Sequence, residues 1–177
     1  MGRYAGWIAL NGGIAGGADI ILIPEIPFDW DSVYEKVLKR NIHGKRFSIV
    51  CVAEGAKAKD GNLVIKETDK KRTDPIRLGG IAELVAKNIE TNTRLETRYT
   101  VLGHLQRGGV PTPFDRILST KFGTFAVDLV MRKQFGRMVA LRGNNISDVD
   151  ITDAIAHQKL VKPNDQGVIA ANAVGVS

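Results

Sequence analysis

The sequence predicts an α/β fold: a mostly parallel sheet with helices on both of its faces. Short, continuous apolar runs at 19–23, 47–53 and 138–141 indicate buried strands, because strands covered on both faces lack polar alternation. Stretches with apolar residues at helical spacing separate these runs. Hydrophobic residues make up 44% and charged residues 25% of the 177 residues, which is typical of a soluble globular protein.

Three helices are expected in the first half of the chain. The first, 4–17, is rich in Ala and Gly. The second has Asp29 or Asp31 as its N-cap and carries Val33, Val37 and Leu38 on one face. The third has apolar residues three and four positions apart, at Ile81, Leu84, Val85 and Ile89. The polar stretch 55–76 predicts a loop with a small hairpin around 62–66.

The second half predicts a strand at 96–102, a long helix from Thr112, the strand at 138–141 and a short helix at 151–157. Thr112 fits an N-cap, Pro113 the first helical position and Asp115 the third, which is the pattern of a helix start. The apolar stripe of this helix comprises Phe114, Ile117, Leu118, Phe122, Phe125, Ala126, Leu129 and Val130.

The charge balance suits an anionic partner. The formal net charge is +6, from 25 Lys and Arg against 19 Asp and Glu. Acidic residues interrupt the densest basic stretch, 66–77, and no stripe of aromatic residues interleaves with arginines. A phosphorylated metabolite is therefore favoured over nucleic acid, which has only the net charge in its favour.

The single cysteine and the apolar pattern indicate a cytoplasmic protein. Cys51 lies inside an apolar run, so we expect a small core residue and not a reactive thiol. A lone cysteine excludes a disulfide framework and indicates a reducing compartment. No apolar run approaches the roughly 20 residues of a membrane span, and residues 1–7 lack the pattern of a signal peptide.

Two short segments that contain or adjoin glycine are candidate anion sites. His104 and Arg107, three positions apart and followed by Gly108 and Gly109, come after the strand expected at 96–102. Both side chains could turn toward one anion there, although a turn with incidental polar residues fits the same pattern. The tripeptide Met1-Gly2-Arg3 would open the first helix, where free N–H groups favour an anion, but three residues alone are weak support.

Two further charged residues belong to expected strands. Glu54 follows the strand at 47–53 and could accept hydrogen bonds from sugar hydroxyls, or could simply be solvated. Arg98 lies within the strand expected at 96–102 and must face solvent, a partner subunit or an anion. The glycines of 12–17 do not form a dinucleotide-binding fingerprint, and the sequence has no P-loop and no zinc-ligand spacing, so no metal site is expected.

Several blocks of the sequence resemble the 6-phosphofructokinase family, in family order and over nearly the whole chain. They read MGRYAGWIAL at 1–10, GGAD at 16–19, LIPE at 22–25, VAEGAK at 52–57, TRYTVLGHLQRGG at 97–109 and PTPFDR at 111–116. The AEGAK form and the LRG segment at 141–143 are similar to the branch whose members use either ATP or pyrophosphate. The resemblance implies one lobe of the two-lobed fold of that family.

The resemblance also implies roles for individual residues. Met1, Gly2 and Arg3 would contact fructose 6-phosphate, and Arg3 would stabilise the transferring phosphoryl group. Glu54 would bind sugar hydroxyls, Arg98 would grip the 6-phosphate in a neighbouring subunit, and His104 and Arg107 would close on the sugar phosphate. Phosphoryl transfer needs positioning and positive charge more than covalent help, which agrees with these residue types.

The resemblance covers only part of the family pattern. The donor loop and the aspartate base of the family lie ahead of the block that matches Met1–Arg3, so we expect the chain alone to be inactive. Mg²⁺ would come with ATP or pyrophosphate, bound mainly by that other half. Positions matching an effector phosphate site are Gly17, Asp19, His43, Lys45 and Arg46, where His43 replaces a family lysine and weakens the site.

The resemblance further predicts domains and assembly. Residues 1–107 would form the sugar-phosphate-binding lobe, 108–150 a segment of the phosphoryl-donor lobe, and 151–177 a returning tail. The enzyme would be a cytoplasmic, glycolytic homodimer or homotetramer that binds neither nucleic acid nor membrane. The alternative from another class is a non-catalytic sugar-phosphate-binding or regulatory module.

Overall fold

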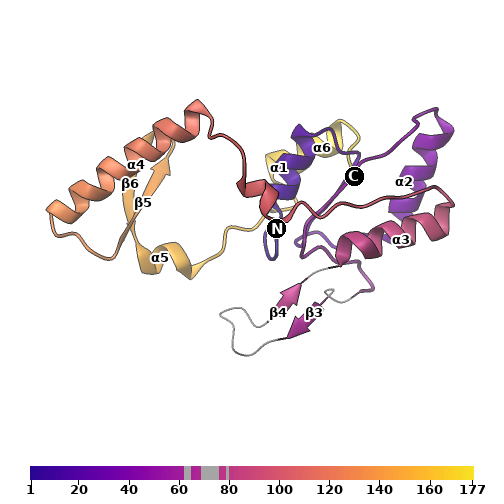
Figure 1. Cartoon of the computed structure of the whole chain (residues 1–177), viewed down its shortest axis with the longest axis horizontal. Coiled ribbons are helices and arrows are strands. Elements are labelled where there is room, and N and C mark those ends of the chain that lie inside the picture. The colour runs from indigo at the N-terminus through magenta and orange to yellow at the C-terminus, as the bar shows by residue number, and fades with distance from the viewer. Residues whose placement is uncertain (62–64, 69–75, 79) are drawn as a thin grey trace. The chain divides into compact units, whose positions relative to one another are not determined.

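The computed structural model describes residues 1–61, 65–68, 76–78 and 80–177. The chain divides into two compact units: residues 1–103 together with 159–177, and residues 104–158. The boundary therefore falls ahead of His104, and the last nineteen residues pack with the first unit. The α/β class is confirmed: the first unit combines helices with two pairs of strands and the second combines helices with one pair (Figure 1).

A parallel pair of strands lies at the centre of the first unit. Strand β1 (Ile20–Leu22) pairs with β2 (Val50–Val52) in the register Ile20↔Val50 to Leu22↔Val52. On the other side of β1, Ser177 N–H donates to the Asp19 carbonyl (3.3 Å) and Ile21 N–H donates to the Ser177 carbonyl (2.8 Å). Both strands are apolar throughout, because helices cover both of their faces.

One face of the pair packs against two amphipathic helices, α2 (Trp30–Ile42) and α3 (Ile81–Thr93). Asp29 is the N-cap of α2, where its carboxylate accepts a hydrogen bond from Ser32 N–H (3.1 Å). The core on this face comprises Ile20, Leu22, Phe28, Val33, Val37, Ala56, Ala58, Ile81, Val85 and Ile89. The apolar periodicity of both helices is thus explained by burial on the sheet, except at Leu38 and Leu84, which are exposed.

The opposite face packs against α1 (Trp7–Ala15) and α6 (Gln166–Ala173), which lie side by side (Figure 1). Ile21 and Cys51 point to this side and contact a core of Ala9, Leu10, Ile23, Ala53, Val161 and Val168. Helix α6 was not predicted, since it is short and buries only Val168 and Ala171. Its start carries a recognisable signal, however: the Asp165 side chain accepts from Gly167 N–H (2.9 Å).

A small antiparallel pair, β3 (Ile65–Thr68) with β4 (Ile76–Leu78), follows β2 in the chain. It corresponds to the hairpin expected around 62–66, of which 62–64 lie outside the described residues. The second strand of the pair, β4, begins at Ile76, where the predicted loop 55–76 was expected to end.

The strand predicted at 96–102 is not formed. Arg94 adopts a left-handed conformation (φ 59°) at the end of α3, and 94–102 continues without regular structure. Threonine side chains bond to the nearby backbone instead: Thr97 Oγ1 donates to the Leu95 carbonyl (3.0 Å) and Leu95 N–H donates to Thr93 Oγ1 (3.3 Å). Such local bonds compete with a ladder, and no described strand pairs with this segment.

The second unit is a long helix, α4 (Pro113–Met131), beside a hairpin of β5 (Arg137–Arg142) and β6 (Asn145–Asp150). The predicted helix start is confirmed as a capping box: hydrogen bonds from Thr112 hold the pKa of Asp115 below its usual value. Strand β6 was missed because it is polar, although Gly143-Asn144 between Arg142 and Asn145 is a typical two-residue hairpin turn. Helix α5 (Ile151–Ala156) then follows as predicted.

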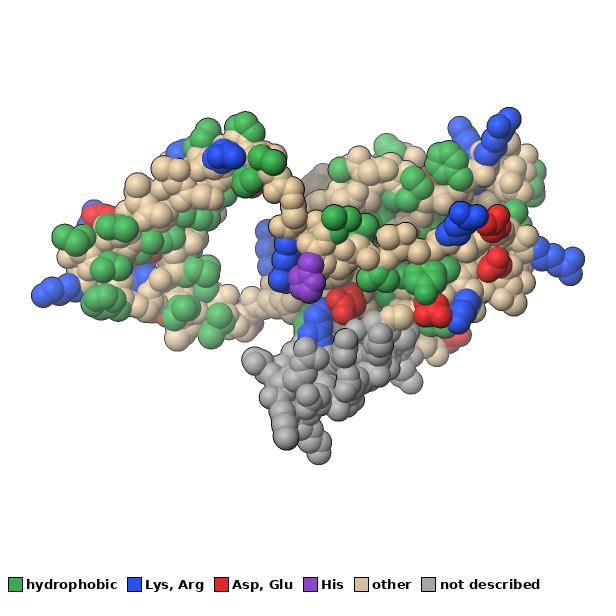
Figure 2. Space-filling model, viewed as in Figure 1, with side chains coloured by type: hydrophobic (Ala, Val, Ile, Leu, Met, Phe, Trp, Pro, Cys, Tyr) green, Lys and Arg blue, Asp and Glu red, His purple; other side chains and the backbone are tan. Residues whose placement is uncertain are grey.

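Much of the apolar stripe of α4 is exposed. Among its members only Leu129 is buried, whereas Phe114 and Ile117 are 64% and 58% exposed. Figure 2 has hydrophobic side chains spread over the unit of α4, β5 and β6. A stripe of this width normally packs against another element, so this surface is suited to contact with further protein. No helix of the described residues is long and apolar enough to cross a membrane.

The core of the first unit makes a direct stability prediction. Leu22 is 3% exposed and Leu102 in the same unit is 52% exposed. We expect Leu22→Ala to lower the free energy of unfolding by about 2–5 kcal/mol, because it leaves a cavity between β1 and its helices. Leu102→Ala should change it by less than about 0.5 kcal/mol. Urea unfolding followed by circular dichroism measures both, and equal losses would contradict the assignment of the core.

Candidate functional site

The carboxyl end of β2 brings together two distant stretches of sequence. Glu54 N–H donates to the Met1 carbonyl (3.0 Å), and Gly55 N–H donates to the Gly2 carbonyl (3.0 Å). The Met1 nitrogen lies 3.5 Å from Glu54 Oε2. Two backbone hydrogen bonds therefore attach the Met1–Arg3 segment beside Glu54, at the edge of the sheet where open α/β folds bind ligands.

Glycines make this close approach possible. A side chain at Gly55 would lie 1.9 Å from the Arg3 carbonyl oxygen, so the two backbones are in direct contact there. Gly2 adopts φ +80°, and a side chain there would lie 3.1 Å from Ala53 Cβ. Sequence reasoning overlooked Gly55, although its position directly after Glu54 at a strand end was a usable signal.

The Met1–Arg3 segment does not open a helix, contrary to expectation. Helix α1 begins at Trp7 with Gly6 as its N-cap, so residues 1–5 form an irregular approach to it. The free N–H groups of a first helical turn are thus absent from Met1–Arg3. Arg3 is half-buried, and its guanidinium carbon lies 5.7 Å from the centre of the Tyr4 ring.

Arg98 lies on the exposed, irregular segment after α3. Its side chain is 89% exposed and pairs with Glu96 at 2.7 Å. The expectation of an arginine inside an apolar strand was therefore wrong, because the segment makes no ladder and leaves the side chain in water. Arg98 is free to reach outward, and an exposed pair of this kind holds it only weakly.

His104 and Arg107 share one turn of 3₁₀-helix, Gly103–Arg107, at the start of the second unit. Residues three apart in a 3₁₀-helix lie on the same side, so the two side chains can face one anion as predicted. Gly103 adopts φ +53°, and Gly108 N–H donates to the Leu105 carbonyl (3.0 Å) to close the turn. The turn follows an irregular segment and not a strand end, which corrects the expected setting.

The residues predicted to form an effector phosphate site lie at the amino ends of β1 and β2. Gly17 and Asp19 precede β1, and His43, Lys45 and Arg46 lie in the connection before β2. Because the strands are parallel, these two connections meet at one edge, opposite the edge that holds Glu54.

Arg40 links the connections before β1 and β2 at this second edge, and the sequence analysis did not predict this role. It pairs with Asp19 (2.8 Å) and donates to Ser48 Oγ (3.1 Å), while the Asp19 carboxylate also accepts from Ile49 N–H (2.9 Å). The His43 ring nitrogen Nδ1 lies 2.6 Å from the Lys39 carbonyl. The position of Arg40 in the last turn of α2, where a cation is favoured, was the available signal.

Cys51 is a half-buried core residue, as predicted. Its thiol lies 3.5 Å from the Ala9 carbonyl, and burial raises the pKa of the thiol. A raised pKa keeps the thiol protonated at neutral pH, which argues against a reactive nucleophile.

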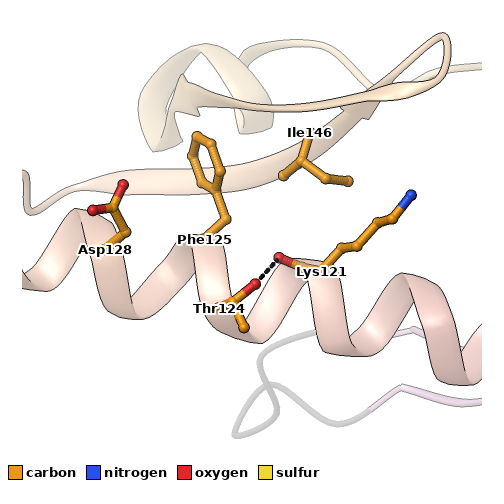
Figure 3. Close-up of a pocket in the computed structure, with 5 residues that line it drawn as sticks. All are labelled: Lys121, Thr124, Phe125, Asp128 and Ile146. Atoms are coloured by element: carbon orange, nitrogen blue, oxygen red, sulfur yellow. Dashed lines mark hydrogen bonds between the residues drawn. The ribbon is translucent and has the colours of Figure 1, made fainter.

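The part of the chain that the structure describes contains no group of three or more His, Cys, Asp or Glu side chains that could hold a metal ion. An open hollow lies between α4 and β6, lined by Lys121, Thr124, Phe125, Asp128 and Ile146 (Figure 3). Phe125 and Ile146 come from the two facing elements, and Thr124 Oγ1 bonds to the Lys121 carbonyl (3.0 Å). None of the predicted site residues lines this hollow, which belongs to the exposed apolar surface of the second unit.

Comparison with known proteins identifies the family. The family model for phosphofructokinase matches residues 1–130. The chain is 51% identical over its whole length to ATP-dependent 6-phosphofructokinase 2 of Clostridium perfringens, of which it covers 49%. Over 92% of its length it is also 51% identical to pyrophosphate–fructose 6-phosphate 1-phosphotransferase of Streptomyces coelicolor, of which it covers 47%.

Solved structures agree with this. Phosphofructokinase of Saccharomyces cerevisiae superimposes with a TM-score of 0.71 and 36% identity over 88% of this chain and 19% of that one. The enzyme of Pichia pastoris gives a TM-score of 0.69 and 35% identity over 88% of this chain and 17% of that one. The chain therefore belongs to the phosphofructokinase family. It spans about half the length of the curated relatives it matches.

The close contact at Gly55 leads to a stability prediction, for which the exposed Gly12 serves as the control position. Gly55→Ala should displace the Met1–Arg3 segment and lower the free energy of unfolding by about 1–3 kcal/mol, because the added methyl overlaps the Arg3 carbonyl. Gly12→Ala, in the middle of α1 with open space around it, should instead raise it by about 0.5–1 kcal/mol. Thermal unfolding of both variants checks this, and a neutral Gly55→Ala would contradict the described contact.

Proposed function

We propose that this chain supplies the fructose 6-phosphate-binding half of a 6-phosphofructokinase, a magnesium-dependent enzyme that transfers a phosphoryl group to the 1-hydroxyl of the sugar. One observation carries the proposal: the Met1–Arg3 segment is hydrogen-bonded to Glu54 and Gly55 at the carboxyl end of β2. Two blocks that resemble substrate-binding blocks of the family, about fifty positions apart in the sequence, thus meet at one strand end. The 51% identity to relatives named for fructose 6-phosphate chemistry supports the same function.

The chemistry of the paired segments fits a sugar phosphate. The Glu54 carboxylate, half-exposed at the sheet edge, is an acceptor for sugar hydroxyls. The Arg3 guanidinium is permanently charged and can stabilise a transferring phosphoryl group, whose negative charge is spread over several oxygens. Met1 and Gly2 contribute backbone groups and shape beside these two side chains. No covalent step by this chain is required.

The sugar phosphate would be closed in by further cations. His104 and Arg107 share one side of a 3₁₀ turn, so both can donate to the same phosphate. Their assignment to the sugar phosphate rests on the family resemblance and on this shared side. On the same basis, residues 1–107 would form the sugar-phosphate lobe, with 108–150 contributing to the donor lobe.

The phosphoryl donor and its Mg²⁺ would be bound mainly by the other half of the enzyme. The described residues of this chain offer no acidic cluster that fits Mg²⁺, which prefers carboxylates and donor phosphates. Relatives named for ATP and for pyrophosphate match with equal identity, so both donors belong in the assay. On the basis of the family resemblance, the enzyme would be cytoplasmic and would act in glycolysis.

Arg98 would serve a neighbouring subunit in a homodimer or homotetramer. Its side chain is almost fully exposed on an irregular segment, and its pair with Glu96 is easily exchanged for a phosphate. The amino edge of the sheet, with Gly17, Asp19, His43, Lys45 and Arg46, would be a separate effector phosphate site. There Arg40 already neutralises Asp19, which favours an anion at the remaining cations.

A chimera tests the catalytic proposal. Replacing the matching half of the Clostridium perfringens relative with this chain should give 6-phosphofructokinase activity with ATP or pyrophosphate, whereas the 177-residue chain alone should give none. In the chimera Arg3→Ala should lower kcat/KM by about 100-fold or more, since it removes charge that stabilises the transition state.

The matched control for this experiment is Arg132→Ala, an exposed arginine on the far end of α4 that pairs with Asp128. It should leave kcat/KM within about twofold. A soluble, folded chimera without activity toward fructose 6-phosphate, or equal losses in both variants, would refute the proposal.

Mixed subunits test the shared site. In the chimera, Arg98→Ala and Glu54→Ala should each lose most activity, because each removes one contact from every site. Mixing the two variants should restore part of it, since some hybrid sites contain both intact side chains. Coupled enzyme assays measure the recovery, with subunit exchange verified by native mass spectrometry. No recovery in verified hybrids would mean that Arg98 serves its own subunit or none.

A further inference from the structure

Glu25 is a half-buried carboxylate to which neither the sequence pattern nor the proposed function gives a role. It follows Pro24 in a tight turn after β1, closed by pairing between Ile23 and Ile26. Its two oxygens lie 2.9 Å and 3.1 Å from Gly6 N–H, and Oε1 also accepts from Val161 N–H (2.9 Å). One side chain thus satisfies two backbone donors from distant parts of the chain.

The approach of the carboxylate to Gly6 requires the absence of a side chain there. A Cβ at position 6 would lie 2.4 Å from Ile23 Cβ and 2.9 Å from Glu25 Oε2. Gly6 is also the N-cap of α1, so the carboxylate lies at the end of the helix where negative charge is favoured. The position of Gly6 is therefore fixed by packing, by hydrogen bonds and by charge together.

Arg3 lies between two anchors of one short irregular segment. Residues 1 and 2 are bonded to Glu54 and Gly55, and Gly6 is bonded to Glu25. Residues 1–5 belong to no helix or strand, so these anchors hold the segment that carries Arg3 at both of its ends. Loss of either anchor would let the Arg3 backbone move relative to Glu54.

We propose that Glu25 is a positioning residue for the sugar-phosphate site, holding Arg3 through Gly6. This inference rests on the proposed function, which assigns fructose 6-phosphate to Arg3 and Glu54. Glu25 would act through the backbone N–H groups that both of its oxygens bind, and not by touching the sugar.

The bond to Val161 gives Glu25 a separate structural role. Val161 is 2% exposed, and the segment before it is fixed to α1 by Trp7, whose Nε1–H donates to the Lys159 carbonyl (2.7 Å). Loss of the whole carboxylate would leave two donors unsatisfied and destabilise the unit. A test of positioning must therefore separate the two roles.

Glu25→Gln makes that separation. An amide oxygen in place of Oε1 can still accept from Gly6 and Val161, so the fold is retained. The amide nitrogen in place of Oε2 would instead face Gly6 N–H as a second donor and carries no charge for the end of α1. This variant should loosen Gly6, and with it Arg3, more than it loosens Val161.

The experiment is titration of the 177-residue chain with fructose 6-phosphate, followed by NMR, together with hydrogen exchange of its amides. The variants are Glu25→Gln, Glu25→Ala and Arg3→Ala, with Glu35→Gln on the exposed side of α2 as the control of equal charge change. We expect the dissociation constant to rise at least fivefold in Glu25→Gln and further in Glu25→Ala, and to stay unchanged in Glu35→Gln. Exchange should accelerate in residues 1–6 and stay constant across α2 and α3.

The outcomes distinguish the two claims. Binding by the unaltered chain that Arg3→Ala abolishes supports the proposed function, and an unchanged dissociation constant in both Glu25 variants would then overturn the positioning role alone. Weaker binding with accelerated exchange throughout α2 and α3 would also overturn it, since the effect would be general unfolding. If the unaltered chain binds no fructose 6-phosphate, the proposed function fails; the anchoring of residues 1–6 by Glu25 is then decided by exchange alone, and unchanged exchange there refutes it.

Discussion

The parallel pairing of β1 with β2 is the constraint on which the rest of the first unit depends. It aligns Leu22 with Val52, so that the turn after β1 and the turn after β2 leave the sheet at the same edge. Glu25 and Glu54 follow these two strand ends, and each fixes one end of the segment that carries Arg3. The opposite edge collects Asp19 and Lys45 from the connections before the two strands, together with Arg40 from the last turn of α2. Two polar regions thus arise from one pairing of three residues per strand.

This arrangement also explains why the core is so strictly apolar. Alternate residues of the two strands face different helix pairs, with Ile20 and Leu22 toward α2 and α3 and Ile21 and Cys51 toward α1 and α6. Every position on both strands is apolar, so polar groups are confined to the strand ends. The chemistry that the chain can perform is therefore restricted to those ends and to the separate turn that carries His104 and Arg107.

Sequence patterns predicted most of the elements, because local signals determined them. The apolar runs gave β1, β2 and β5, and the side chains of Asp29 and Thr112 marked the starts of α2 and α4. The strand predicted at 96–102 is not formed because alternation alone cannot supply a neighbouring strand. Helix α6 was overlooked because it is short, and β6 because it is polar. The family blocks indicated Arg3 and Glu54 together, but their contact depends on β1–β2 pairing that no local signal contains. Gly55, Arg40 and Glu25 were missed for the same reason, since each acts through a residue far away in the sequence.

The central claim is that the carboxyl edge of the β1–β2 pair binds the sugar phosphate. Amide chemical shifts of the chain in the presence of fructose 6-phosphate test it most directly, since backbone N–H groups of Glu54 and Gly55 bond to residues 1 and 2 at that edge. The account predicts saturable shifts at Gly2, Glu54 and Gly55, with little change at Gly17 and Gly44 on the opposite edge. Shifts confined to the opposite edge, or none at the carboxyl edge at saturating sugar phosphate, would contradict it.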